Sequence, residues 1–451
     1  MARVLDEDQL KIVNSKAKNI CVIAGAGSGK TTVLTARIRH LIENEGVIPE
    51  DIVAITFTNA AADEMRERLS DIKDVDTMFI GTIHSFANAL LHASMPDVDY
   101  TVLSDEKFQW AAEIVCKKYC KKLTAEKVIG YKDICEKYRN GKVKIEDVEN
   151  YFDAFEEQEY LAMMRLSVDG VAKPENKSYP ESIFSWCEKR NILTFDNIIK
   201  YAKKHLGKEF TFPYLFVDEY QDVGTLEDSF IQALEAEHLF IVGDDWQSIY
   251  GFKGAIVEIF KGYVNNPEWT VYHLDRNYRS ASEIIRLAGE VIQDDDERLP
   301  KNVKGMNQES GAVKLDSQKE LIWYLKSIRK SKEYRNWFLL ARTRKDINQI
   351  YDFCEMIGLP AFFFSREGLS KEQEQEMLSR NAVKIATIHG VKGLESDNVM
   401  LYGKFPVHGE MPDNTWRDYE KRRRWYEERR IMYVGVTRAK TKLVLLSDEN
   451  F

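Results

Sequence analysis

The sequence is poor in the features that mark non-globular and secreted proteins. Its 451 residues include only 10 prolines and 24 glycines, which excludes collagen-like, mucin-like and disordered chains. The six cysteines are scattered and do not form the framework of a small disulfide-rich domain. No apolar run reaches the roughly 18 residues that cross a bilayer, and the first residues lack the apolar segment of a signal peptide. We therefore expect a cytoplasmic protein that makes no membrane contacts.

An excess of positive charge is also absent. The chain has 64 Lys and Arg against 73 Asp and Glu, for a formal net charge of −9. This balance argues mildly against a protein that coats duplex DNA through a basic surface. It does not exclude a protein that holds one strand in a narrow channel, because only the local charge matters there. The length is typical of about three domains.

Short apolar strands alternate with helical patterns along most of the chain, which predicts an α/β fold of parallel sheets flanked by helices. In the first hundred residues we expect strands at 19–24, 51–58 and 78–84 and helices at 31–43, 59–69 and 85–92. Later strands are expected at 214–219, 238–244, 270–274, 337–342, 361–364, 383–389, 399–403 and 442–447. Residues 103–207 have helical spacing with few strand signals and predict a helical insertion. The acidic run 294–297 is expected in an exposed loop.

The most specific local signal is the glycine-rich run Gly25-Ala26-Gly27-Ser28-Gly29-Lys30-Thr31, which follows a predicted strand and opens a predicted helix. Glycines let successive backbone N–H groups face phosphate oxygens, and the helix N-terminus adds a positive dipole. Lys30 is then expected to reach the β- and γ-phosphates of a nucleotide, and the Thr31 hydroxyl to ligate Mg²⁺.

Two carboxylates follow another predicted strand. Leu215-Phe216-Val217 is apolar, and Asp218 and Glu219 come directly after it. Asp218 suits a contact to Mg²⁺, and Glu219 suits the polarisation of a water that attacks the γ-phosphate. The second carboxylate favours ATP hydrolysis over phosphoryl transfer to another substrate.

At Asp218-Glu219-Tyr220-Gln221-Asp222 the sequence resembles the superfamily 1 DNA helicases of the UvrD/Rep/PcrA group, whose second motif reads D-E-[FY]-Q-D. In the third motif, the run Asp244-Asp245-Trp246-Gln247-Ser248-Ile249-Tyr250 is most similar to the helicase IV branch. The family's other motifs follow in order at Gln9, Phe57–Ala61, Gly81–Phe86, Val242–Tyr250, Asn277–Ser280, Thr387–Glu395 and Tyr433–Ala439.

This resemblance implies two RecA-like lobes with ATP bound between them. The first lobe is expected to span 1–102 and 208–279 and the second 280–451, with the insertion 103–207 belonging to the first. Relatives carry a large accessory subdomain in the second lobe. Here only a short segment near 365–381 is left for it, which has room for one helix.

The resemblance also implies functional residues. Those implied in catalysis are Lys30, Glu219, Gln247, Arg279 and Arg438, with the two arginines acting as arginine fingers across the cleft. Those implied in ATP binding are Gln9, Ala24, Gly25, Ala26, Gly27, Ser28, Gly29, Lys30, Thr31, Thr32, Tyr278, Arg279, Glu395 and Arg438. Mg²⁺ is implied at Thr31 and Asp218. Those implied in DNA binding are Phe57, Asn59, Thr82, His84, Tyr250, Phe252 and His389. Several positions depart from the family pattern: Thr32, Gly251 and Lys253 replace arginines, and Phe252 replaces a tryptophan.

The function implied is an ATP-dependent single-stranded DNA translocase or DNA helicase that uses Mg²⁺ and moves 3′ to 5′. Single-stranded DNA is the expected partner, although RNA is not excluded because base stacking ignores the sugar. A protein partner such as a nuclease is a further expectation, in repair, recombination or phage defence. The alternative is a nucleotide-switched DNA-binding subunit that hydrolyses ATP slowly and does not unwind DNA by itself.

Overall fold

The computed structural model describes residues 4–95, 100–102, 192–208, 210–251, 255–307, 311–315, 318–365, 371–403 and 419–446. The chain divides into two compact units. The first comprises Met1–Met78, Tyr214–Asp222 and His238–Phe451, and the second comprises Phe79–Pro213 and Val223–Glu237. Most of the predicted insertion 103–207 lies outside the described residues, so the expected domain bounds stay a prediction.

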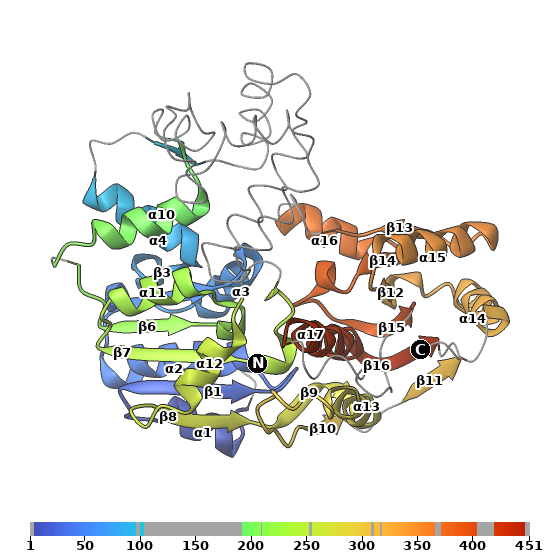
Figure 1. Cartoon of the computed structure of the whole chain (residues 1–451), viewed down its shortest axis with the longest axis horizontal. Coiled ribbons are helices and arrows are strands. Elements are labelled where there is room, and N and C mark those ends of the chain that lie inside the picture. Colours follow the sequence, from blue (N-terminus) through green and yellow to red (C-terminus); the bar gives the residue numbers. More distant parts are fainter. Residues whose placement is uncertain are drawn as a thin grey trace. The chain divides into compact units, whose positions relative to one another are not determined.

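The first unit contains a parallel sheet whose strand β1 (Asn19–Ala24) leads into the glycine-rich run (Figure 1). Its neighbouring strands are β2 (Ile52–Thr56), β6 (Tyr214–Val217), β7 (His238–Gly243), β1 (Asn19–Ala24) and β8 (Thr270–Leu274), in that order. The inner strands are almost entirely apolar and buried, as expected of a parallel sheet that is covered on both faces. Because the strands are parallel, the loops that follow β1, β6 and β7 emerge at one edge.

Local caps set some of the helix ends in this part of the chain. The helices are α1 (Glu7–Val13), α2 (Lys30–Glu45), α3 (Asn59–Leu69) and α12 (Val257–Val264). Asp6 caps α1 in a capping box with Gln9, and the Thr58 hydroxyl caps α3. Gly46 ends α2 in the left-handed conformation that favours glycine.

The first unit also holds a second parallel sheet, in the order β11 (Ala312–Leu315), β16 (Ala439–Leu446), β15 (Ser396–Tyr402), β12 (Trp337–Ala341), β14 (Val383–Thr387) and β13 (Ala361–Phe363). A short parallel pair, β9 (Arg276–Ala281) with β10 (Lys304–Asn307), precedes it in the chain. Its helices are α13 (Ser282–Ile292), α14 (Gln318–Ser331), α15 (Arg344–Met356), α16 (Lys371–Ser379) and α17 (Tyr419–Val436).

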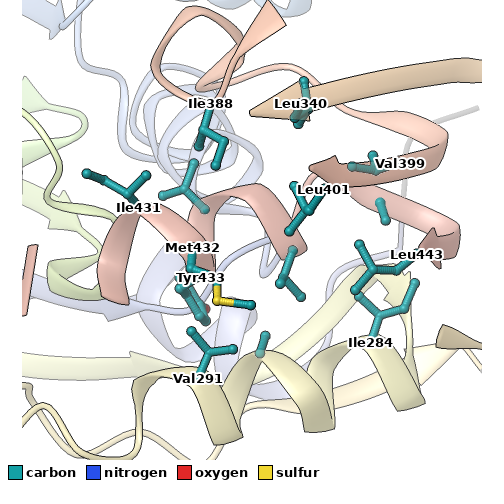
Figure 2. Close-up of a cluster of buried hydrophobic side chains, with 14 of the residues drawn as sticks. Ile284, Val291, Leu340, Ile388, Val399, Leu401, Ile431, Met432, Tyr433 and Leu443 are labelled. Atoms are coloured by element: carbon teal, nitrogen blue, oxygen red, sulfur yellow. The ribbon is translucent and has the colours of Figure 1, made fainter. Parts of the chain in front are cut away.

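A buried apolar cluster fixes α17 against this sheet. Figure 2 shows Met432 of α17 among side chains from α13, β15 and β16. The members with labels are Ile284, Val291, Leu340, Ile388, Val399, Leu401, Ile431, Met432, Tyr433 and Leu443. Because these side chains are close-packed, the end of α17 and the residues directly after it have little freedom.

The second unit is described through β3 (Phe79–Thr82), α4 (Ile83–Ser94), the pair β4 (Thr101–Val102) and β5 (Ile192–Leu193), α10 (Phe195–Lys204) and α11 (Thr225–Ala233). Helix α10 packs against α4 and α11. Within the described part of the chain, none of the helices combines the length and apolar character that crossing a membrane requires.

The α/β class and the parallel sheets confirm the prediction from the sequence, and β1 and β8 have the predicted bounds. Five of the described strands, β4, β5, β9, β10 and β11, were not predicted. The expectation of an exposed loop at 294–297 is wrong for Asp295, which is fully buried. Its carboxylate accepts a hydrogen bond of 2.7 Å from the buried Arg430 of α17, and this pairing makes the burial of the charge tolerable.

Candidate nucleotide site and nucleic-acid groove

The glycine-rich loop between β1 and α2 has the backbone that phosphate binding requires. Gly27 and Gly29 have φ values of 62° and 90°, in the left-handed region that favours glycine. A Cβ at Gly27 would lie 2.7 Å from the Cβ of Arg279 and from Nδ2 of Asn277. Glycine is therefore needed at position 27 both for its conformation and for the close approach of β9. The loop ends at Lys30, the first residue of α2.

Lys30 and the carboxylates after β6 form the charged centre of the site. Lys30 Nζ lies 3.0 Å from Glu219 Oε2, and the Thr31 hydroxyl donates to Asp218 Oδ2 at 3.3 Å. Burial and the charge of Glu219 raise the pKa of Asp218 to about 7. Burial alone would raise the pKa of Glu219, but Lys30 and Lys392 lower it to about 2. Glu219 is therefore ionised at neutral pH.

Glu219 is held in an unusual backbone conformation. Its φ of 52° is in the left-handed region, which non-glycine residues rarely adopt. Asp218 Oδ1 accepts from the Glu219 N–H at 2.8 Å, and Gln221 Nε2 donates to Glu219 Oε2 at 2.6 Å. These bonds aim the carboxylate at Lys30. Strain of this kind is concentrated at functional sites.

Gln247 and Arg438 join the second sheet to this centre. Gln247 is buried, its amide donates to Asp244 Oδ2 at 2.5 Å, and its Oε1 accepts from Arg438 Nη2 at 3.0 Å. Burial and the charge of Arg279 lower the pKa of Arg438 to about 9, while Glu219 acts in the opposite direction. The Arg438 guanidinium therefore lies within the electrostatic reach of Glu219.

Arg279 is paired with an acid from the second sheet. Its Nε lies 2.5 Å from Glu395 Oε2, and Lys440 contacts the other oxygen of Glu395 at 2.8 Å. Burial would raise the pKa of Glu395, but these two cations lower it. Arg279 Nη1 also donates to the carbonyl of Thr437, which directly precedes Arg438. The two predicted arginine fingers thus lie close together.

Gln9 and Tyr278, two of the residues implied in ATP binding, both contact the glycine-rich loop. Gln9 Nε2 donates to the Ser28 carbonyl at 3.1 Å, and Gln9 Oε1 accepts from the Asp6 N–H at 3.1 Å. The Tyr278 N–H donates to the Gly27 carbonyl at 3.0 Å, and its hydroxyl donates to the Asp6 carboxylate. Gln9 and Tyr278 are therefore both attached to the loop by hydrogen bonds.

An aromatic groove adjoins the charged centre. Phe57 and Tyr250 stack with ring centroids 5.3 Å apart, and the His389 ring lies 6.3 Å from Tyr250. Lys392 Nζ lies 4.5 Å from the centre of the Tyr250 ring. Burial and Arg342 lower the pKa of His389 to about 4, so its imidazole is neutral at pH 7.

The groove contains a cavity of about 230 Å³. Its walls come from α3, from the loops that follow β6 and β7, from the segment after β14, and from α16. The lining residues are Phe57, Thr58, Ala60, Ala61, Glu64, Glu219, Asp222, Tyr250, Glu374, Gln375, Lys392, Gly393 and Leu394. Because Glu219 is one of them, the groove and the charged centre share a wall.

The chain matches a known family over most of its length. Residues 5–267 match the model of the UvrD/REP helicase N-terminal domain, and residues 363–450 match that of the UvrD-like helicase C-terminal domain. The chain belongs to the UvrD/REP helicase family.

Three relatives illustrate how much of this family the chain spans. A probable DNA helicase of Mycoplasma pneumoniae is 27% identical over 99% of the chain and 84% of its own length. DNA helicase II of Haemophilus influenzae is 32% identical over 66% of the chain and 42% of its own length. ATP-dependent DNA helicase PcrA of Staphylococcus aureus is 26% identical over 75% of the chain and 48% of its own length. The chain therefore spans less than half the length of the last two relatives.

The site of this UvrD/REP family member suits the nucleotide and metal that the family implies. The buried Ser28 hydroxyl lies in the glycine-rich loop and has no hydrogen-bond partner, so it can donate to a phosphate oxygen. Thr31 and Asp218 present two oxygens, the ligand type that Mg²⁺ prefers. No group of three or more His, Cys, Asp or Glu is arranged for a metal among the described residues.

The structure does not connect four of the predicted nucleic-acid contacts to the groove. Asn59 begins α3 and is exposed. Thr82 caps α4, and the His84 ring meets Phe195 edge-on at 5.2 Å, both within the second unit. Phe252 lies outside the described residues. A role for these four residues in nucleic-acid binding stays a prediction.

One departure from the family pattern has a structural counterpart. Thr32 stands where relatives often have an arginine, and its hydroxyl accepts from Arg68 Nη1 at 3.0 Å. A guanidinium from α3 therefore reaches the first turn of α2. At Gly251, a Cβ would lie 3.2 Å from the Glu427 carboxylate, so a larger side chain has little room. Lys253 lies outside the described residues.

Sequence reasoning missed two lysines, Lys392 and Lys301, that contact acids in the loops after β6 and β7. Lys392 Nζ lies 2.5 Å from Asp222 Oδ2 and donates to the Gln247 carbonyl at 2.8 Å. It belongs to the motif Thr387–Glu395, and a cation inside a family motif was the available signal in the sequence. Lys301 also contacts the loop that carries Gln247, but it lies in no motif, and its sequence position gives no signal.

Proposed function

We propose that this chain is an ATP-hydrolysing DNA motor of the helicase type, driven by ATP bound at Lys30 and regulated by a strand in the aromatic groove. The observation that supports the proposal is that the nucleotide site and the aromatic groove share a wall. Glu219 pairs with Lys30 in the nucleotide site and also lines the groove. A strand that enters the groove therefore changes the surroundings of the carboxylate on which hydrolysis depends.

The roles follow from charge and position. Lys30 and the loop N–H groups bind the phosphates of ATP, and Glu219 accepts a hydrogen bond from the attacking water. Arg438 and Arg279 stabilise the negative charge that builds on the γ-phosphate as its bond to the β-phosphate oxygen breaks. Thr31 and Asp218 hold Mg²⁺, which neutralises phosphate charge when bound. Gln247 connects Arg438 to the loop that leads to the groove.

The groove suits unpaired bases of any sequence. Phe57 and Tyr250 offer ring faces on which bases stack, and His389 is neutral at pH 7 and can donate or accept one hydrogen bond. Single-stranded DNA is the substrate that family membership favours. Movement from 3′ to 5′ and stimulation of hydrolysis by the strand complete the proposal.

Unwinding by this chain is expected to depend on a partner, such as a nuclease, or on another wedge. The segment in which relatives carry the accessory subdomain contains α16, and α16 contributes Glu374 and Gln375 to the groove. A helix of nine residues is too small to act as an independent domain. Efficient unwinding of long duplexes by the purified chain would contradict this dependence.

ATP turnover measured with and without single-stranded DNA tests the proposal. We expect strong stimulation by DNA, loss of turnover in Lys30→Ala and Glu219→Gln, and preserved strand binding in Glu219→Gln. Low turnover that DNA does not change would favour the nucleotide-switched binding subunit instead. RNA strands of the same length test the choice of nucleic acid, and strands labelled at either end report the direction of movement.

A further inference from the structure

Lys301 is a buried cation that no motif contains. It lies between α13 and β10, and its side chain is fully buried. The ammonium donates to Asp244 Oδ1, lies 2.7 Å from Asp245 Oδ1, and donates to the Ala24 carbonyl at 3.1 Å. Ala24 is the last residue of β1, directly before the glycine-rich loop. One ammonium thus joins the starts of two loops of the nucleotide site.

A short series of hydrogen bonds connects Lys301 to an arginine finger. Lys301 binds one oxygen of Asp244, and the other oxygen of Asp244 accepts from the Gln247 amide at 2.5 Å. This contact fixes the Gln247 amide with Oε1 toward Arg438, from which it accepts at 3.0 Å. All of these side chains are buried, so water does not compete for the bonds.

The backbone around Lys301 is held by the same loop. Asp245 Oδ2 accepts from the Leu299 N–H at 2.7 Å, and the Trp246 indole donates to the Leu299 carbonyl at 3.0 Å. The Lys301 ammonium also lies 4.9 Å from the centre of the Trp246 ring. The Trp246 ring in turn meets Tyr433 of α17, which Figure 2 labels, at 5.5 Å. The position of the ammonium is therefore set from several sides.

We propose that Lys301 is a positioning residue for ATP hydrolysis. It orients Asp244, and through Asp244 it holds the Gln247 amide in the orientation that keeps Arg438 in place. The inference deepens the proposed function and rests on it. On this proposal Lys301 acts through Asp244 and Gln247 rather than on the nucleotide or the strand itself. The experiment must distinguish this positioning role from a purely structural role, in which Lys301 only neutralises two buried carboxylates.

The central experiment is a double-mutant cycle of Lys301→Met and Gln247→Ala, read as strand-stimulated turnover. We expect Lys301→Met to lower kcat on the order of 10- to 100-fold, the effect of an ångström-scale displacement of a catalytic group. The KM for ATP should change less than about threefold, since the phosphate contacts are retained. Because both changes interrupt one chain of contacts, the double variant should be about as slow as the slower single variant. Multiplied effects would overturn the proposal.

A second comparison separates positioning from charge balance. The change Asp245→Asn in the Lys301→Met background restores the original net charge of the buried group. It leaves Asp244 without its cation. We expect the pair of changes to recover thermal stability and not kcat. Recovery of both would mean that neutralisation is the whole role of Lys301.

Lys384→Met is the matched control. Lys384 is also buried, on β14, and donates to the Arg335 carbonyl at 2.5 Å. Its loss should lower stability and leave kcat unchanged.

If the wild-type chain proves not to hydrolyse ATP, the proposed function fails, and the same cycle read by denaturant unfolding decides the role of Lys301. Coupling between positions 301 and 247 in the free energy of unfolding would support the contact chain, and its absence would refute it.

Discussion

On the proposed function, binding of ATP breaks the ion pair between Lys30 and Glu219. Lys30 Nζ lies 3.0 Å from Glu219 Oε2, where a phosphate oxygen of ATP would compete for it. The side chains are 10% and 26% exposed, so water screens the pair only in part. We therefore predict that Glu219→Gln binds ATP more tightly than the wild type while hydrolysing it far more slowly.

The magnitude follows from the pair that is lost. A hydrogen bond to a charged group contributes about 1.5–3 kcal/mol, and a neutral one about 1 kcal/mol. The ion pair lies at the upper end of the charged range, and the bond from the Lys30 ammonium to a neutral glutamine lies at its lower end, so the competing interaction weakens by about 1.4 kcal/mol, which is tenfold in Kd. Removal of a negative charge beside the triphosphate acts in the same direction. The dissociation constant for ATP should therefore fall by about tenfold.

Equilibrium binding of a fluorescent ATP analogue, with Mg²⁺ present, measures this effect. Glu64→Gln is the control, because Glu64 lines the same cavity from α3 and pairs with Arg68 rather than Lys30. It should leave the affinity unchanged. An affinity in Glu219→Gln equal to or weaker than that of the wild type would show that the Lys30–Glu219 pair does not compete with ATP, and the reasoning would fail.

Three further predictions concern residues at or beside the shared wall. The free energy of unfolding of Glu219→Gly should exceed that of Glu219→Ala by about 1 kcal/mol, because the left-handed backbone at this position suits glycine. Equal denaturation midpoints of the two variants would contradict this. Burial raises the pKa of Asp222 to about 6, against the opposing charge of Lys392, so the folded state keeps a proton that the unfolded state has lost. The free energy of unfolding of the wild type should therefore fall relative to that of Asp222→Asn as the pH rises from 4 to 6, by at most about 1.4 kcal/mol per pH unit, and parallel curves would refute this. Tyr250→Ala should weaken single-stranded DNA binding by about 1–3 kcal/mol in a fluorescence titration and leave ATP affinity unchanged, whereas an unchanged DNA affinity would exclude stacking.

The elements that the sequence predicted well are those whose own residues determine them. β1 is an apolar run with clear ends, β8 is rich in β-branched and aromatic residues, and α3 begins at a Thr cap, so local pattern was sufficient. β9 was missed because Arg276–Ala281 is a polar segment without alternation. It becomes a strand only through pairing with β10 and through contact with the glycine-rich loop. Neither partner can be inferred from its sequence.

The same division applies to the site. Lys30, Asp218 and Glu219 were predictable because each lies at a fixed offset from a strand or helix end. The Arg430–Asp295 pair and the contacts of Lys301 join residues that are distant in the chain, and only tertiary packing brings them together. The acidic run 294–297 predicts a solvated loop, because Arg430, the cation that pairs with Asp295, lies 135 positions away in the sequence.

Glu219 connects the two halves of the proposed cycle. Lys30 holds it in the nucleotide site, Lys392 contributes to its low pKa, and Lys392 also lies on the Tyr250 ring in the groove. A strand that stacks on Tyr250 competes for the space of Lys392, and any shift of that ammonium changes the field at Glu219. When ATP takes Lys30 away, Glu219 depends more strongly on Lys392. Strand and nucleotide therefore act on the same carboxylate from opposite sides, and this explains in physical terms how each could alter the affinity for the other.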